Sequence, residues 1–189
     1  MSRDSGNDPL KLVVLDRDGV INRDSPDFIR TAEQWEPLPG SLEAIAELTR
    51  AGWTVVVATN QSGIARGYLT RRELERIHAR MESAVRQAGG RIDAIFVCPH
   101  GPGEGCECRK PGTGLFRQIE ARYGQPVAGV PAVGDSERDL EAARRAGARP
   151  ILVMTGNGRE TAARLGAAAP EAYADLKSAA SALIGTDRC

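Results

Sequence analysis

The sequence predicts an α/β fold, a three-layer sandwich in which helices cover both faces of a central parallel sheet. Short runs of aliphatic and β-branched residues alternate along the chain with segments of helical periodicity. The apolar runs are nearly continuous, which is typical of strands buried on both faces of a parallel sheet. The 189 residues fit one domain of ordinary size. We expect a flexible tail over residues 1–10 and a single domain over residues 11–189.

The expected strands and helices alternate in chain order. Five strands are expected, over residues 12–16, 54–58, 92–97, 132–135 and 151–154. The helix expected over residues 41–50 has one apolar stripe and ends near Gly52. The next helix begins at Thr70 and Glu73, which have capping-box spacing, and its apolar face continues to Ala88. Further helices are expected over residues 115–122, 137–146, 160–165 and 174–183. Ligands of such folds bind at the carboxyl ends of the strands.

Charge and hydropathy exclude several classes of protein. The 25 basic and 25 acidic residues give a formal net charge of zero, which disfavours a strongly basic nucleic-acid binder. No apolar stretch approaches the length of about 18 residues that spans a bilayer, and residues 1–9 lack the apolar region of a secretion signal. We therefore expect a cytoplasmic monomer with reduced cysteines and no nucleic-acid or membrane partner.

Two carboxylates follow the first expected strand, in the segment Asp16-Arg17-Asp18-Gly19. Carboxylates at this spacing can converge on one site, where one acts as nucleophile or magnesium ligand and the other as acid and base. The same residues are also compatible with a simple turn before a glycine. Taken alone, the segment leaves both interpretations open.

The second expected strand ends in Thr59-Asn60-Gln61-Ser62. A hydroxyl, amides and a run of backbone N–H groups at a strand end can hold phosphate oxygens. An ordinary polar loop has much the same composition, so this segment is weak evidence by itself.

The fourth strand ends at Asp135, where a metal ligand from a second strand would be needed. Ser136 and Asp139 have the spacing of a helix N-cap and its N3 acid, so we expect Asp139 to act as structural support. Before the fourth strand, Arg109 and Lys110 precede a proline and supply two adjacent cations that can offset the carboxylates of the other segments and a phosphoryl group.

Together, the ordered segments DRDG, ATNQSG, CRKP and VGDSERD resemble the haloacid dehalogenase superfamily of phosphohydrolases over about residues 12–156. The resemblance implies that Asp16 is the nucleophile and forms an aspartyl phosphate. It implies that Asp18 is the general acid that protonates the leaving alkoxide and then activates water. Thr59 and Lys110 would bind the transferring phosphoryl group.

The resemblance also implies a magnesium ion, held by Asp16, Asp135 and the backbone carbonyl of Asp18, with Asp139 in support. Magnesium prefers oxygen ligands and would screen Asp16 from the phosphate that it attacks. Lys110 and Thr59 would face the oxygens on which transition-state charge is spread.

A second metal site is predicted by Cys98-x-His100 and Cys106-x-Cys108. Three thiols and an imidazole match a closed, tetrahedral zinc site of structural type. The segment between the two pairs, GPGEG, cannot bury apolar area, so a metal would replace the missing core. The alternative is a flexible loop with reduced cysteines, and residue type alone does not distinguish zinc from iron.

The substrate expected from the resemblance is a small phosphorylated sugar. The gaps between the catalytic segments are too short for a cap domain, so the chain is most similar to minimally capped, zinc-bearing members of the superfamily. This implies removal of the 7-phosphate of D-glycero-D-manno-heptose 1,7-bisphosphate, a sugar of lipopolysaccharide and S-layer biosynthesis. The substrate contacts that it implies are Arg109, the loop of residues 24–27 with Asp24, and Asn60, Gln61 and Ser62.

Other functions remain open. The short spacer between His100 and Cys106 also fits histidinol-phosphate phosphatases. A non-catalytic interaction protein on an inactive scaffold would lack part of the catalytic set, which is present. Zero net charge disfavours a polynucleotide 3′-phosphatase. We assign no chemistry to His78, expected on a half-buried or exposed helix position, to the expected turn at residues 156–158, or to Cys189.

Overall fold

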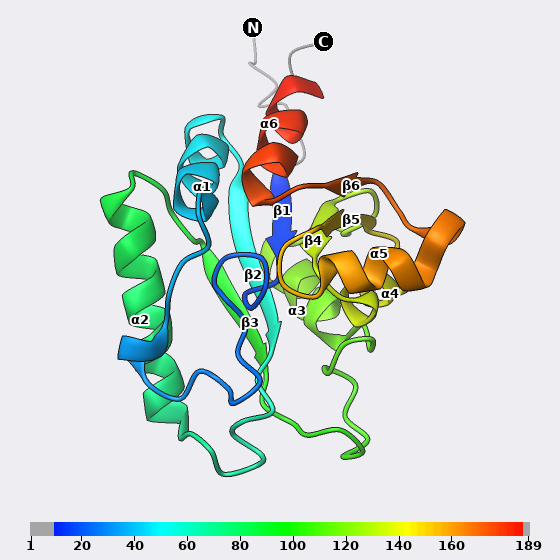
Figure 1. The fold of residues 1–189 in the computed structure, drawn as a ribbon. Helices are drawn as coiled ribbons and strands as arrows, with labels where there is room; N and C mark the ends of the chain where they lie inside the picture. The colour runs from blue at the N-terminus through cyan, green and yellow to red at the C-terminus, as the bar shows by residue number, and fades with distance from the viewer. Residues whose placement is uncertain (1–9, 187–189) are drawn as a thin grey trace, which may run out of the picture.

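Six parallel strands form one central sheet in the computed structural model of the protein, which describes residues 10–186 (Figure 1). The strand order is β3-β2-β1-β4-β5-β6, and every neighbouring pair is parallel. The strands are β1 (Leu12–Leu15), β2 (Thr54–Asn60), β3 (Ala94–Cys98), β4 (Pro131–Gly134), β5 (Arg149–Val153) and β6 (Ala172–Tyr173). The predicted three-layer α/β fold is thus confirmed. Residues 1–9 of the expected tail lie outside the described residues, and so does Cys189.

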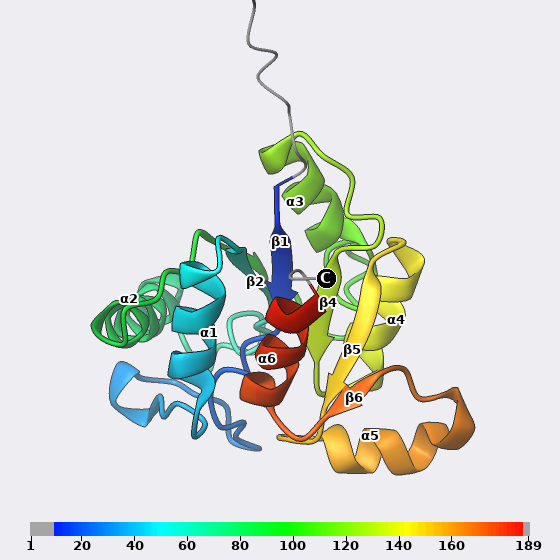
Figure 2. The same ribbon diagram turned by 90° about the horizontal axis from the view of Figure 1, so that it is seen from above.

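Helices cover both faces of the sheet (Figure 2). On one face lie α1 (Ser41–Arg50), α2 (Arg71–Gln87) and α6 (Leu176–Thr186), and on the other lie α3 (Gly114–Tyr123) and α4 (Glu137–Arg145). The shorter α5 (Gly158–Leu165) lies beside the β6 edge. None of the helices within residues 10–186 has the length and apolarity needed to cross a membrane.

The strands are buried on both sides, as their continuous apolar runs predict. Along β1, Val13 and Leu15 join the core under α1, α2 and α6, whereas Leu12 and Val14 join the core under α3 and α4. Because successive side chains point to opposite faces, a strand between two layers must be apolar at every position.

Some elements differ from the prediction. The third strand was expected over residues 92–97 but begins at Ala94, because Asp93 accepts from the Val55 backbone N–H through its carboxylate at 3.0 Å. The edge strand β6 and the short 3-10 helices Ala32–Gln34 and Gly166–Ala168 were not predicted. Each is two or three residues long and carries no periodic signal.

The topology brings the predicted chemistry to one edge of the sheet. Strand order reverses around β1, which lies between β2 and β4, and ligands of open α/β folds bind at such a point. The segments after β2 and β3 run side by side there (Figure 1). The Gln61 backbone N–H donates to the Cys98 carbonyl at 2.7 Å, and that of Ala65 donates to the Pro99 carbonyl at 3.3 Å.

Candidate active site

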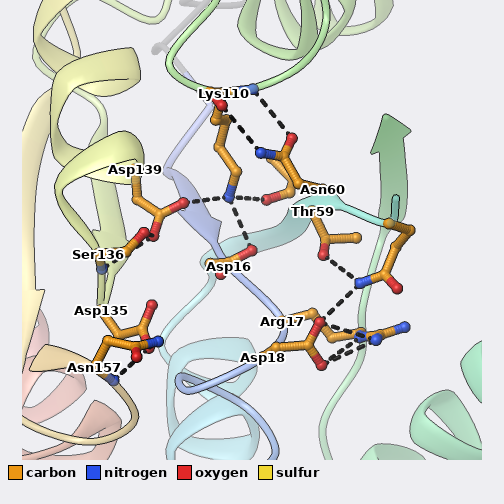
Figure 3. Close-up of polar contacts among 12 residues, drawn as sticks. Asp16, Arg17, Asp18, Thr59, Asn60, Lys110, Asp135, Ser136, Asp139 and Asn157 are labelled. Atoms are coloured by element: carbon orange, nitrogen blue, oxygen red, sulfur yellow. Dashed lines mark hydrogen bonds and ion pairs between the residues drawn. The ribbon is translucent and has the colours of Figure 1, made fainter. Parts of the chain in front are cut away.

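Lys110 lies at the centre of the site, between Asp16 and Asp139 (Figure 3). Its Nζ donates to Asp16 Oδ1 and to the Ala58 carbonyl, both at 2.8 Å, and lies 2.6 Å from Asp139 Oδ1. The Lys110 side chain is 4% exposed. Asp16 directly follows β1, and Asp139 lies in the first turn of α4, so three separate segments meet at one ammonium group.

The ionisable groups of this cluster differ in how burial and neighbouring charges shift their pKa values. Burial raises the pKa of the Asp16 carboxyl to about 7, although Lys110 opposes the shift. Burial also raises the pKa of Asp135, to about 6. For Asp139 the effect of burial is outweighed by Lys110, and its pKa lies below the usual range. Burial would lower the pKa of Lys110, but the two carboxylates raise it. Asp139 is thus the carboxylate whose charge Lys110 compensates. Asp16 and Asp135 have too little positive charge nearby to offset the cost of burying their carboxylates.

Asp135 is held in a way that leaves one oxygen free. Its Oδ2 accepts from the backbone N–H and the side-chain Nδ2 of Asn157, at 2.8 and 3.0 Å. Its Oδ1 is buried, and none of the described residues bonds to it. A Cβ atom on Gly19 would lie 2.1 Å from Asp135 Oδ2, and one on Gly156 would lie 2.2 Å from it. Only glycine fits at these two positions.

The carboxylates of Asp16, Asp135 and Asp139 each offer an oxygen, and these oxygens lie within 4.8 Å of one another. Oxygen donors, an excess of negative charge and the unbonded Asp135 Oδ1 suit a magnesium ion. The arrangement therefore fits the predicted magnesium site at Asp16 and Asp135, while Asp139 is engaged with Lys110 and Ser136.

Asp18 is anchored on the other side of the site. Arg17 Nη2 donates to both Asp18 carboxylate oxygens at 2.9 Å, and Asn22 Nδ2 and Gln61 Nε2 donate to it at 2.9 and 2.8 Å. Burial would raise the Asp18 pKa, but Arg17 and these hydrogen bonds outweigh it, and the pKa is lowered. Arg17 Nη1 in turn donates to His78 Nε2 at 3.3 Å. Burial and the adjacent Arg17 lower the His78 pKa to about 3, so His78 is a neutral acceptor.

The end of β2 and the residues that follow it mainly position other groups. Thr59 Oγ1 is buried and accepts from Gln61 Nε2 at 2.9 Å. Asn60 binds the backbone of Lys110 twice: its Nδ2 donates to the carbonyl at 3.1 Å, and its Oδ1 accepts from the N–H at 3.0 Å. The amides of Asn60 and Gln61, expected to contact a sugar, are thus bonded within the protein. Ser62 is buried and lines the cavity above Asp16.

That cavity has a volume of about 360 Å³. The predicted substrate residues Asp24 and Arg109 line it together with the catalytic candidates Asp16, Asp18, Thr59 and Lys110. Sequence reasoning missed Arg17, Asn22, His78 and Asn157. His78 is half-buried on α2, as expected, but its bond to Arg17 carried no sequence signal. Asn157 does lie in a turn after β5, as expected, and there it fixes Asp135.

Cys98, at the end of β3, forms a second cluster with His100, Cys106 and Cys108 from the loop between β3 and α3. Cys98 Sγ lies 3.7 Å from Cys106 Sγ, and His100 Nδ1 lies 3.2 Å from Cys108 Sγ. A tetrahedral zinc site with metal–sulfur distances of about 2.3 Å separates two sulfurs by about 3.8 Å. The four side chains therefore fit the predicted zinc site. Arg109 Nη1 donates to the His100 carbonyl at 3.1 Å, which ties the loop to the cavity.

Fold and site together define a phosphoric monoester hydrolase of the HAD-like class. The HAD-hydrolase-like family model matches residues 107–179, and the polynucleotide kinase 3 phosphatase model matches residues 11–138. D-glycero-beta-D-manno-heptose-1,7-bisphosphate 7-phosphatase of Bordetella bronchiseptica is 59% identical over 157 residues, which cover 83% of this chain and 88% of that protein. The Pseudomonas aeruginosa protein of the same name is 53% identical over 92% of this chain and 97% of its own.

A solved structure that is similar to this chain is of the same kind of protein as these relatives. The D,D-heptose 1,7-bisphosphate phosphatase of B. bronchiseptica, complexed with magnesium and phosphate, superposes with a TM-score of 0.91 at 54% identity. The match covers 94% of this chain and 99% of that one. The chain belongs to the family of D-glycero-D-manno-heptose-1,7-bisphosphate 7-phosphatases.

Proposed function

We propose that the protein is a magnesium-dependent phosphatase that removes the 7-phosphate of D-glycero-β-D-manno-heptose 1,7-bisphosphate through an aspartyl phosphate. The observation that carries the proposal is that Asp16, Thr59 and Lys110 line one cavity, with a carboxylate oxygen of Asp135 within 4.8 Å of one of Asp16. The substrate, and its β anomer, are proposed because relatives at 59% and 53% identity bear that name.

Asp16 is placed to act as the nucleophile. Its Oδ1 is occupied by Lys110 Nζ at 2.8 Å, which leaves Oδ2 for attack on phosphorus. The new bond joins Asp16 to phosphorus as the ester bond to the sugar breaks, and the sugar oxygen takes a proton from Asp18. Lys110 and the Thr59 hydroxyl stabilise the phosphoryl oxygens. A magnesium ion held by Asp16, Asp135 and the Asp18 carbonyl would neutralise charge between nucleophile and phosphate.

Asp18 must exist in two protonation states during this cycle. With Arg17 beside it, the carboxylate is the resting form. An entering phosphate brings negative charge close to Asp18 and so raises its pKa, which favours the protonated acid. After the sugar has left, the carboxylate takes a proton from water as that water attacks phosphorus, and Asp16 and inorganic phosphate are released.

The proposal is tested by phosphate release in the presence of magnesium from both anomers of the heptose bisphosphate, histidinol phosphate and an oligonucleotide with a 3′-phosphate. We expect a preference for the β anomer of about a hundredfold or more over histidinol phosphate. The oligonucleotide is included because one matching family model carries that activity in its name. Preferred release from histidinol phosphate or from the oligonucleotide would overturn the proposed substrate.

The nucleophile is tested separately with Asp16→Asn. We expect this variant to release no phosphate above background, because an amide cannot form the acyl phosphate. Glu75→Gln, which alters an exposed carboxylate on α2, is the matched control and should behave like the wild type. Unchanged turnover by Asp16→Asn would rule out the aspartyl phosphate.

A further inference from the structure

The guanidinium group of Arg17 has two different partners. Its Nε and Nη2 donate to the Asp18 carboxylate at 3.0 and 2.9 Å (Figure 3). The remaining nitrogen, Nη1, donates to His78 Nε2 at 3.3 Å, and within residues 10–186 it has no other hydrogen-bond partner. The Arg17 side chain is 1% exposed, so bulk water has little access to it. His78 therefore completes the set of acceptors around a buried cation.

His78 is suited to accept this bond. A guanidinium group has donors only, so Nε2 must carry the lone pair and the proton of the neutral ring lies on Nδ1. Burial and the adjacent Arg17 lower the His78 pKa to about 3, which keeps the ring an acceptor at neutral pH. The ring belongs to α2, a helix of 17 residues that is fixed to the sheet by a stripe of buried apolar side chains. The acceptor is thus held by a rigid element.

The orientation of Asp18 depends on this arrangement. Its side chain is 20% exposed and lines the cavity, and Arg17 binds both of its oxygens. A buried donor without an acceptor is costly, so a guanidinium that loses His78 is expected to turn towards another acceptor. Its two-oxygen contact with Asp18 would then be lost. A proton donor has to lie within hydrogen-bond reach of the leaving oxygen, so such a shift impairs proton transfer.

We infer that His78 is a positioning residue for the proton donor Asp18 and that it acts through Arg17. The inference rests on the proposed function, in which Asp18 protonates the oxygen of the leaving sugar. His78 does not line the cavity, so it acts without touching the substrate. Its contribution should be largest when the leaving group needs a proton. A sugar alkoxide is a strong base and needs one, whereas 4-nitrophenolate is a weak base and leaves as the anion.

The two kinetic constants report different steps. The ratio kcat/KM covers the steps up to release of the leaving group. In contrast, kcat also includes hydrolysis of the aspartyl phosphate, in which Asp18 acts as the base for every substrate. The dependence on the leaving group should therefore be seen in kcat/KM. A merely structural role of His78 would lower kcat/KM for all substrates by the same factor.

The test measures kcat/KM of His78→Leu and His78→Gln for the β-heptose 1,7-bisphosphate and for 4-nitrophenyl phosphate. We expect His78→Leu to lower the value for the bisphosphate by about tenfold or more, because the proton donor is displaced. The value for 4-nitrophenyl phosphate should fall by less than about threefold. His78→Gln should stay within about threefold of the wild type on the bisphosphate, because its Oε1 can accept from Arg17.

The matched control is Val85→Ala, which removes buried apolar atoms from the same helix. Val85 makes no hydrogen bond to Arg17. This variant should lower the melting temperature but leave the ratio of the two kcat/KM values at that of the wild type. It therefore distinguishes the positioning of Asp18 from a general loss of stability.

The outcomes also distinguish this inference from the proposed function. A wild-type enzyme that does not hydrolyse the bisphosphate overturns both, and this is known before any variant is measured. If the wild type does hydrolyse it, three results overturn the role of His78 and leave the proposed function standing. These are wild-type kinetics of His78→Leu, equal losses on the two substrates, and a His78→Gln variant as impaired as His78→Leu.

Discussion

Two aspartates that follow the same strand, Asp135 and Asp139, have different surroundings. Asp139 is neutralised by Lys110 at 2.6 Å and also accepts from the Ser136 N–H, so its charge is already matched. Asp135 has only the two Asn157 donors on one oxygen and nothing on the other among the described residues. The two carboxylates therefore have separable roles, one towards a cation and one towards Lys110.

This difference predicts different effects for two isosteric variants, one on the magnesium response and one on kcat. Asp135→Asn should abolish the magnesium-dependent rise in melting temperature and raise the half-saturating magnesium concentration by about tenfold or more. Asp139→Asn should keep the magnesium response but lower kcat by about tenfold or more, because Lys110 loses one of its two carboxylates. Thermal unfolding against magnesium concentration and steady-state rates measure the two effects. Equal magnesium responses in both variants would contradict the assignment.

At the scale of single elements, α2 shows how a local sequence signal fixes a helix that supports the site. Thr70 Oγ1 accepts from the Glu73 N–H at 3.2 Å, and the Thr70 N–H donates to Glu73 Oε2 at 2.6 Å, which is the predicted capping box. The helix then carries His78 to Arg17. The start of α2 is thus linked to the anchoring of Asp18.

Loss of this cap should therefore destabilise the fold. Thr70→Ala should lower the free energy of unfolding by about 1 kcal/mol and the melting temperature by about 2–4 °C, and Thr70→Ser should restore most of both. The bonds from the Thr70 backbone and hydroxyl hold the Glu73 pKa below its usual value of 4.5. The contribution of ionised Glu73 is therefore present above that value and is lost as the pH falls through the lower, folded-state pKa. Denaturant unfolding at neutral and acidic pH should show the difference between Ala and wild type shrinking in acid.

The same elements show what the sequence can predict. Apolar runs place β1 to β5 to within two residues, because a buried strand needs an unbroken apolar segment. The edge strand β6 has no such requirement and left no signal. Residues of the active site that directly follow strands were found in the same way. Arg17 and His78 lie 61 positions apart, and their contact depends on how α2 packs on the sheet. Asn157 looked like a turn residue, because its bond to Asp135 exists only once β4 and β5 are paired.

For the molecule as a whole, the loop between β3 and α3 connects the sheet to Lys110 in the active site. Cys98 belongs to β3, and the last ligand of the cluster, Cys108, is followed at once by Arg109 and Lys110. Little apolar side chain is available in this loop to hold it in place. A metal bound by the four side chains would therefore fix both ends of the loop and, through them, Lys110.

This connection predicts that zinc supports both folding and catalysis. Reduced, purified protein should contain about one equivalent of zinc, and Cys106→Ser should contain less than about 0.2 equivalents. The same variant should lose several degrees of melting temperature and lower kcat/KM by about tenfold or more, because Arg109 and Lys110 lose their fixed backbone. Cys189→Ser is the matched control, since it removes the one cysteine outside the cluster. Elemental analysis, thermal unfolding and phosphate release should change together. A zinc-free Cys106→Ser variant with wild-type turnover would show that the loop holds Lys110 without the metal.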